Sequence, residues 1–78
     1  MKLSIYNSEE STFIAQDVHP SKYFDNVIPI TGDIIDIISP DNKNKASIYI
    51  VKKRCITSRR ASTHTTLYID KLEDYDIE

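Results

Sequence analysis

The chain has 78 residues, a net charge of −2, 40% hydrophobic residues and 28% charged residues. This length allows one small domain, and the balanced composition excludes wholesale disorder. No apolar run is long enough to span a bilayer, the N-terminus shows no signal peptide, and the single cysteine, Cys55, excludes an internal disulfide. These features favour a cytoplasmic protein without a membrane partner.

The N-terminal third of the chain predicts two short strands and one helical turn. Residues 2–6 (KLSIY) alternate between apolar and polar, and residues 11–18 (STFIAQDV) include the Thr, Phe and Ile that suit a pleated sheet. Pro20 ends the second strand because it has no backbone N–H to donate. Ser21 is suited to cap one helical turn over residues 21–26.

The middle of the chain contains the clearest turn and strand. Gly32, the only glycine, precedes Asp33 and predicts a turn. Residues 34–38 (IIDII) have apolar side chains on both faces, which indicates a strand buried on two sides or a strand with an exposed apolar patch.

This segment also resembles a known fold. Residues 29–37 read Pro29-Ile30-Thr31-Gly32-Asp33-Ile34-Ile35-Asp36-Ile37. They resemble the motif P-x-x-G-D-x-(V/I)-x-(V/I), which leads into a strand of SH3-like barrels. The similarity extends over about residues 27–70 in the order of elements. It implies a fold class and carries over no functional residue, because this superfold hosts many functions.

The C-terminal half predicts a long hairpin. Residues 46–57 (ASIYIVKKRCIT) and 63–70 (THTTLYID) are its two strands. If Ala61 and Ser62 centre the turn, the facing pairs are Ile56 with Leu67, Thr57 with Thr66, Cys55 with Tyr68 and Lys53 with Asp70. The residues then expected on one apolar face are Ile48, Ile50, Ile56, Leu67 and Ile69. Lys52 and Arg54 would point to the same face, which predicts a bulge nearby. The turn residues leave the register open.

These elements predict an all-β fold. We expect a small five-stranded SH3-like barrel or a half-open β-sandwich, with at most one short helical turn. Residues 1–72 are expected to form the single domain. Residues 73–78 are expected to be a frayed acidic C-terminal tail.

The charges are sorted along the chain. Residues 43–69 contain seven basic residues and no acid, whereas the segments on either side are acidic. Functionally, the cations of the basic 43–60 segment could contact phosphates while Tyr49 or Tyr68 stacks on a base. The expected partner-binding residues, for protein or nucleic acid, are Lys52, Lys53, Arg54, Arg59, Arg60, Tyr49 and Tyr68. The alternative is a solvated strand whose charges discourage aggregation.

No catalytic or cofactor site is expected. The chain has no glycine-rich phosphate loop, no C-x-x-C and no H-x-x-x-H, and Asp33 and Asp36 should point to opposite faces. Cys55 is expected to pack as a small apolar residue. We therefore expect no enzyme activity, no metal and no cofactor.

Three hypotheses about function remain. The favoured hypothesis is a non-catalytic binding module that acts on a protein partner, as an accessory or inhibitor protein of phage or mobile-element type that occludes a larger partner. The tyrosines and the surplus of isoleucine support it, and an edge strand would also allow a homodimer. The alternative is a nucleic-acid-binding barrel that uses the 43–60 segment, with the acidic tail as modulator. A sequence pI of about 5.6 weighs against that alternative. A third hypothesis, that the acidic 1–42 surface imitates nucleic acid, ranks last.

Overall fold

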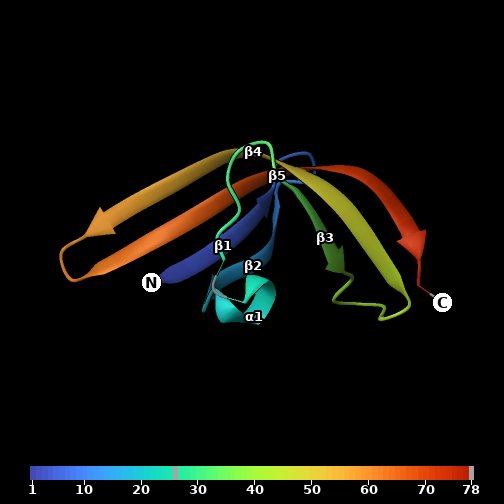
Figure 1. Cartoon of the computed structure of the whole chain (residues 1–78), viewed down its shortest axis with the longest axis horizontal. Coiled ribbons are helices and arrows are strands. Elements are labelled where there is room, and N and C mark those ends of the chain that lie inside the picture. The colour runs from blue at the N-terminus through green and yellow to red at the C-terminus, as the bar shows by residue number, and fades with distance from the viewer. Residues whose placement is uncertain (26, 78) are drawn as a thin grey trace.

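The structure is a computed structural model that describes residues 1–25 and 27–77. The described elements are β1 (Lys2–Asn7), β2 (Thr12–Val18), α1 (Ser21–Phe24), β3 (Ile34–Ile38), β4 (Lys45–Arg59) and β5 (Ser62–Asp76). The strands form one open sheet in the order β2-β1-β5-β4-β3 (Figure 1). The expected all-β fold with one short helical turn is therefore confirmed. The SH3-like resemblance stays a prediction.

The core lies on the inner face of the bent sheet. β1 pairs with β5 in parallel and with β2 in antiparallel fashion, so it lies inside the sheet. Its Leu3 and Ile5 are fully buried, as are Leu67 and Ile69 on β5. Partly buried residues of α1 and of the segment before β3 pack against this cluster. We call the opposite surface, which carries Ile34 and Ile38, the outer face.

Two irregularities bend the β4–β5 hairpin, which arches over the rest of the chain (Figure 1). The register shifts between Ile48 and Tyr49 and again between Val51 and Lys53, where Lys52 is the extra residue on β4. Bulges bend strands and increase their twist. The bulge expected near Lys52 is thus present.

The predicted hairpin register is wrong by two residues. Arg59 pairs with Ser62, so Arg60 and Ala61 form the turn, and Arg60 has a φ of 28°. The facing pairs are therefore Ile56 with Thr65, Thr57 with His64, Cys55 with Thr66 and Lys53 with Tyr68. The shifts also change the faces: Tyr49 and Val51 face the core, whereas Ile48 and Ile50 lie on the outer face. No strong turn signal specified the register.

The prediction of a frayed tail over residues 73–78 is wrong for residues 73–77, and residue 78 lies outside the described part of the chain. β5 continues to Asp76, where it pairs with Lys45, and the Ile77 N–H donates to the Asn44 carbonyl at 2.7 Å. This end of the chain is polar, so its own residues gave little strand signal. Pairing along β4 supplies the order that propensity alone does not.

The first turn of α1 also differs from the prediction. The helix is preceded by Pro20 without a side-chain cap. The Ser21 side chain hydrogen-bonds His19 Nδ1 at 2.8 Å instead, so Ser21 does not cap the helix. The turn at Gly32 is present as expected, with a φ of 95° that suits glycine. Within residues 1–25 and 27–77, no helix has the length and apolar character needed to cross a membrane.

Candidate functional site

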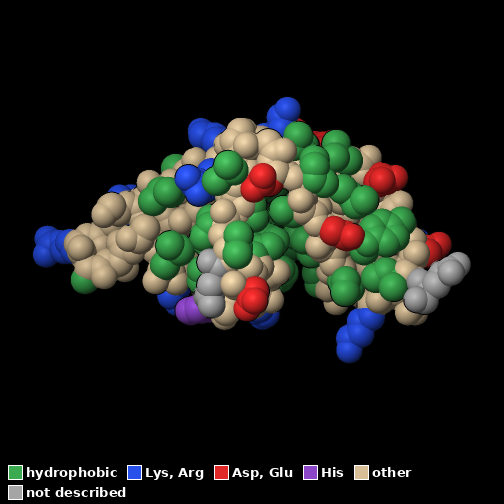
Figure 2. All heavy atoms as spheres, viewed as in Figure 1, with side chains coloured by type: hydrophobic (Ala, Val, Ile, Leu, Met, Phe, Trp, Pro, Cys, Tyr) green, Lys and Arg blue, Asp and Glu red, His purple; other side chains and the backbone are tan. Residues whose placement is uncertain are grey.

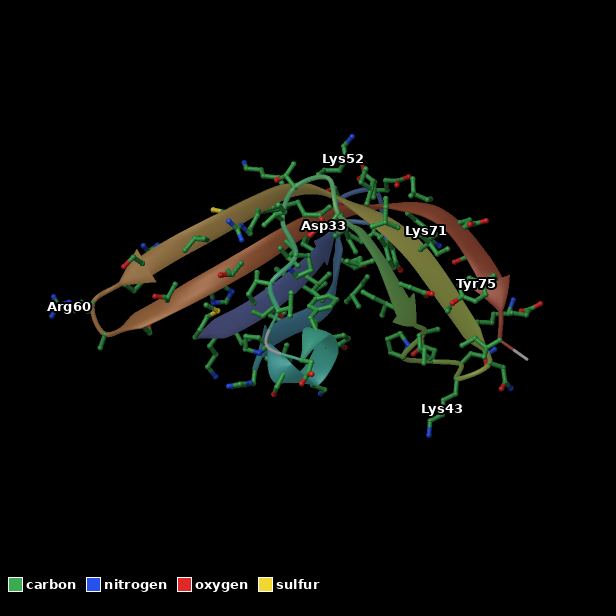
Figure 3. The ribbon with its side chains drawn as sticks, in the orientation of Figure 1. Asp33, Lys43, Lys52, Arg60, Lys71 and Tyr75 are labelled. Carbon is green, nitrogen blue, oxygen red and sulfur yellow. The ribbon has the colours of Figure 1, made fainter. Side chains whose placement is uncertain are left out.

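The distal hairpin, defined here as residues 52–68, projects from the body of the molecule. It carries five cations and no acid: Lys52, Lys53, Arg54, Arg59 and Arg60. β3 pairs only with Ala46–Ile50 of β4, so the described strands leave the outer side of distal β4 without a neighbour. Figure 2 shows basic side chains at the far end of the hairpin, and Figure 3 places Arg60 at its tip. The cations are therefore open to an approaching ligand.

The five cations surround the hairpin rather than form one flat patch. By the register, Lys53 and Arg59 lie on the outer face and Arg54 lies on the inner face. Lys52 stands on the bend and points away from the sheet (Figure 3). Among these side chains, Lys53 Nζ lies 5.5 Å from the ring centroid of Tyr68, within cation–π range. The structure thus brings Lys53 and Tyr68 together, as a combined phosphate and base site requires.

Of the acids that follow the hairpin, Asp70 lies at the bend opposite Ile50, whereas Glu73, Asp74 and Asp76 lie toward the other end of the molecule. Asp76 pairs with Lys45 at 3.5 Å, and Asp74 pairs with Lys71 at 3.3 Å. Figure 3 places Tyr75 opposite Arg60 along the long axis, which measures 44 Å. The Debye length at physiological salt is about 8 Å, so this end scarcely weakens the potential at the hairpin tip. The expectation that the tail modulates the basic segment by covering it does not fit this arrangement.

A short network at this acidic end links the two long strands. Ser47 Oγ donates a hydrogen bond to Asp74 Oδ1, and Lys71 Nζ donates to Asp74 Oδ2. The Ser47 hydrogen bond, and after it Lys71, lower the pKa of Asp74. The hydrogen bond to Asp74 raises the pKa of Lys71.

This network predicts a loss of stability in acid. Because the pKa of Asp74 is lower in the folded state, its contribution is fully present above the ordinary aspartate pKa and is lost as the pH falls through the folded pKa. In urea unfolding, Asp74→Asn should therefore be less stable than the wild type at neutral pH. The difference in the free energy of unfolding should shrink as the pH is lowered. Ser47→Ala should show a smaller difference from the wild type, which should also shrink as the pH is lowered. A difference that is independent of pH would contradict the assignment.

Aromatic rings extend the site across the outer face, and the sequence interpretation missed two of them. The Tyr6 ring makes edge-to-face contacts with Phe13 at 5.0 Å and with Tyr68 at 5.8 Å between centroids. Phe13 is 47% exposed. The row forms because Tyr6 pairs with Phe13 on β2 and with Tyr68 on β5. Only the β1–β2 pairing had a local sequence signal.

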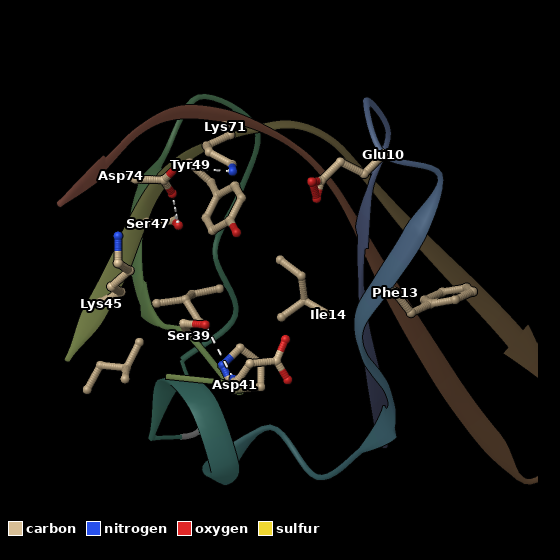
Figure 4. A pocket seen from close by; sticks show the side chains of 13 residues that line it. Glu10, Phe13, Ile14, Ser39, Asp41, Lys45, Ser47, Tyr49, Lys71 and Asp74 are labelled. Carbon is tan, nitrogen blue, oxygen red and sulfur yellow. Dashed lines mark hydrogen bonds and ion pairs between the residues drawn. The ribbon is translucent and has the colours of Figure 1, made fainter. Parts of the chain in front are cut away.

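Tyr49, which was predicted to contact a partner beside the basic residues, lies on a different face from Lys53 and Arg59. Tyr49 is 8% exposed and lies on the inner face, because the bulge reverses the faces of β4 before Lys52. Its ring points into a cleft of about 520 Å³ between β2 and the proximal ends of the long strands (Figure 4). Lys45 and Lys71 also line this cleft, and each is paired with an acid.

A serine, a histidine and an aspartate also meet in the sheet, which the sequence interpretation did not foresee. Ser4 Oγ lies 3.0 Å from His64 Nε2, and His64 Nδ1 lies 3.2 Å from Asp17 Oδ1. These distances suit a nucleophile, a base and an orienting acid. Ser4, however, is 2% exposed, its Oγ accepts the Asp17 N–H, and it is not among the residues that line the Tyr49 cleft. The network therefore ties β1, β2 and β5 together.

Comparison with known protein families, with curated proteins and with solved structures gives no match.

Proposed function

We propose that the protein is a non-catalytic cytoplasmic binding module that holds single-stranded nucleic acid on the distal hairpin. The observation that carries this proposal is the group of five cations without an acid in residues 52–68, held apart from the acidic end. The net charge of −2 weighs against nucleic acid for the chain as a whole, but the distance between the acidic end and the hairpin supports a locally basic site.

The chemistry of the site supports a single strand over a duplex. Cations on both faces and at the tip of the hairpin suit phosphates that pass around it. Phe13 and Tyr68 offer ring surface on the outer face beside Lys53, where unpaired bases can stack. Bases inside a duplex are already stacked on one another and leave these rings unused.

Fluorescence anisotropy at several salt concentrations tests the proposal. We expect the wild type to bind single-stranded DNA or RNA with an affinity that falls steeply with salt. Arg59→Gln combined with Arg60→Gln should reduce the slope of log K against log salt by about 1.4, since each phosphate contact contributes about 0.7 on a single strand. The matched control, Lys22→Gln with Lys43→Gln, removes the same charge elsewhere and should leave the slope unchanged. Equal effects of the two pairs would refute a site on the hairpin.

Phe13→Ala separates stacking from charge. Loss of one stacked base costs about 1–3 kcal/mol, so the affinity should fall roughly 5- to 150-fold at every salt concentration. The salt slope should stay the same, because no cation is removed. Anisotropy titrations of the same oligonucleotides measure both quantities, and an unchanged affinity would show that the ring contributes nothing.

A protein partner remains the second candidate, in the role of accessory or inhibitor protein. Exposed isoleucines favour it: Ile34 and Ile38 are each 58% exposed on the outer face, far from the hairpin tip. Hydrophobic side chains also gather over the β3–β4 region in Figure 2. Contiguous exposed apolar surface of this kind marks interaction sites. Capture of a partner that is lost on Ile34→Ser with Ile38→Ser, in a chain that stays folded, would support this role.

A further inference from the structure

The outer edge of β3 presents unpaired backbone groups. β3 pairs with β4 alone among the described strands. The Val51 N–H donates to the Asp33 carbonyl and the Ser39 N–H donates to the Lys45 carbonyl, both at 2.9 Å. Backbone groups alternate in direction along an antiparallel strand, so Ile34, Asp36 and Ile38 direct their N–H and C=O groups away from β4. This edge offers hydrogen bonds to one more strand.

Side chains on this edge are apolar at both ends and acidic in the middle. Ile34 and Ile38 point to the outer face on either side of the exposed Asp36. Each of these residues begins a row of cross-strand neighbours on β4 and β5. The rows are Ile34-Ile50-Asp70, Asp36-Ile48-Glu73 and Ile38-Ala46-Tyr75. These three outer-face rows contain three acids and no basic residue. Their apolar surface therefore lies in a negative field.

Asp36 is held in place at the centre of the edge. The Tyr75 hydroxyl donates a hydrogen bond to Asp36 Oδ2, and this bond raises the pKa of Tyr75. A hollow of about 280 Å³ lies beside the strand, lined by Lys22 and Tyr23 of α1 and by Asp36, Ile37 and Ile38. Lys22 is the cation among these lining residues, and the described ion pairs do not join it to Asp36.

We propose that the outer edge of β3 accepts an extended cationic segment of a partner protein as a sixth strand, with the pattern aliphatic-x-(Lys or Arg)-x-aliphatic. The backbone of that segment would pair with Ile34, Asp36 and Ile38, as in other cases of strand addition. Its basic residue would face Asp36, and its aliphatic residues would cover Ile34 and Ile38. Opposite charges across a strand pair are favourable.

The same geometry disfavours a second copy of this chain as the occupant. The sequence of β3 reads the same in both directions around Asp36. A two-fold antiparallel pair that keeps all five residues of β3 paired would place Asp36 opposite Asp36 of the other copy, and like charges directly opposite each other destabilise the pair. The edge lies apart from the distal hairpin, so this inference stands whether or not the hairpin binds nucleic acid.

The test uses the full chain and two synthetic peptides, Thr-Ile-Thr-Lys-Thr-Ile-Thr and the same peptide with Glu in place of Lys, both blocked at their ends. Two-dimensional NMR of the labelled protein should show the Lys peptide shifting the amide signals of residues 34–38. The Lys peptide should bind roughly 3- to 10-fold more tightly than the Glu peptide. The reason is that Lys forms a favourable cross-strand pair with Asp36, whereas Glu forms an unfavourable one.

A charge swap keeps the test independent of folding. Asp36→Lys, with a well-dispersed NMR spectrum as proof of its fold, should reverse the order and prefer the Glu peptide. Equal affinity of both peptides, in the wild type or in this variant, would overturn the proposal. So would the absence of shifts in residues 34–38 at millimolar peptide, or a concentration-dependent dimer of the wild type with its shifts at β3.

Discussion

A chain that ends at Asp70 is expected to lose its cooperative unfolding transition. Residues 71–76 pair with the proximal half of β4, and their removal exposes Ala46, which is 1% exposed in the full chain. The loss of several ladder hydrogen bonds at about 1 kcal/mol each is comparable with the total stability of a domain of this size, about 4–12 kcal/mol. Thermal unfolding followed by circular dichroism measures the effect.

The control for this truncation is a chain that ends at Asp76, which retains every residue of β5. It should melt close to the full chain. If the chain ending at Asp70 unfolds as cooperatively as the control and within about 1 kcal/mol of it, the acidic end contributes nothing to the sheet. Charge substitutions, rather than truncation, are therefore suited to testing the acidic residues in a binding assay.

Leu67→Ala should destabilise the protein by about 2–5 kcal/mol, as expected for a large-to-small change in a packed core. Leu67 is fully buried where β5 lies between β1 and β4. The matched control is Ile34→Ala: Ile34 is 58% exposed, and its truncation should change the free energy of unfolding by about 0.5 kcal/mol or less. Urea denaturation of both variants measures these values. Similar losses in the two would mean that the inner and outer faces are assigned incorrectly.

The fold was predictable where local signals were strong. The Gly32 turn and the β-branched residues after it identify β3, and the alternation in residues 2–6 identifies β1. The hairpin was predictable as an element, but not in its register. Arg60 and Ala61 carry none of the strong hairpin-turn chemistry of Asn-Gly or Asp-Gly, and two opposing register shifts alter which face each residue occupies. Tyr49 was misplaced for this reason.

The candidate site was predictable in part. A run of cations without acids is visible in the sequence, and the structure places those cations together on one projecting hairpin. The aromatic row and the Ser4–His64–Asp17 network depend on the parallel pairing of β1 with β5, which joins residues about sixty positions apart. No local pattern specifies such a pairing. The separation of the acidic end from the hairpin likewise follows only from the tertiary fold.

Nucleic-acid binding by the distal hairpin is tested most directly by an NMR titration of the labelled full chain with a short single-stranded oligonucleotide at low salt. Binding on the distal hairpin should give amide shifts confined to residues 52–68, together with changes in the ring signals of Phe13, and these changes should disappear at high salt. Shifts centred on β3 or on the Tyr49 cleft, or no shifts at millimolar oligonucleotide, would contradict it.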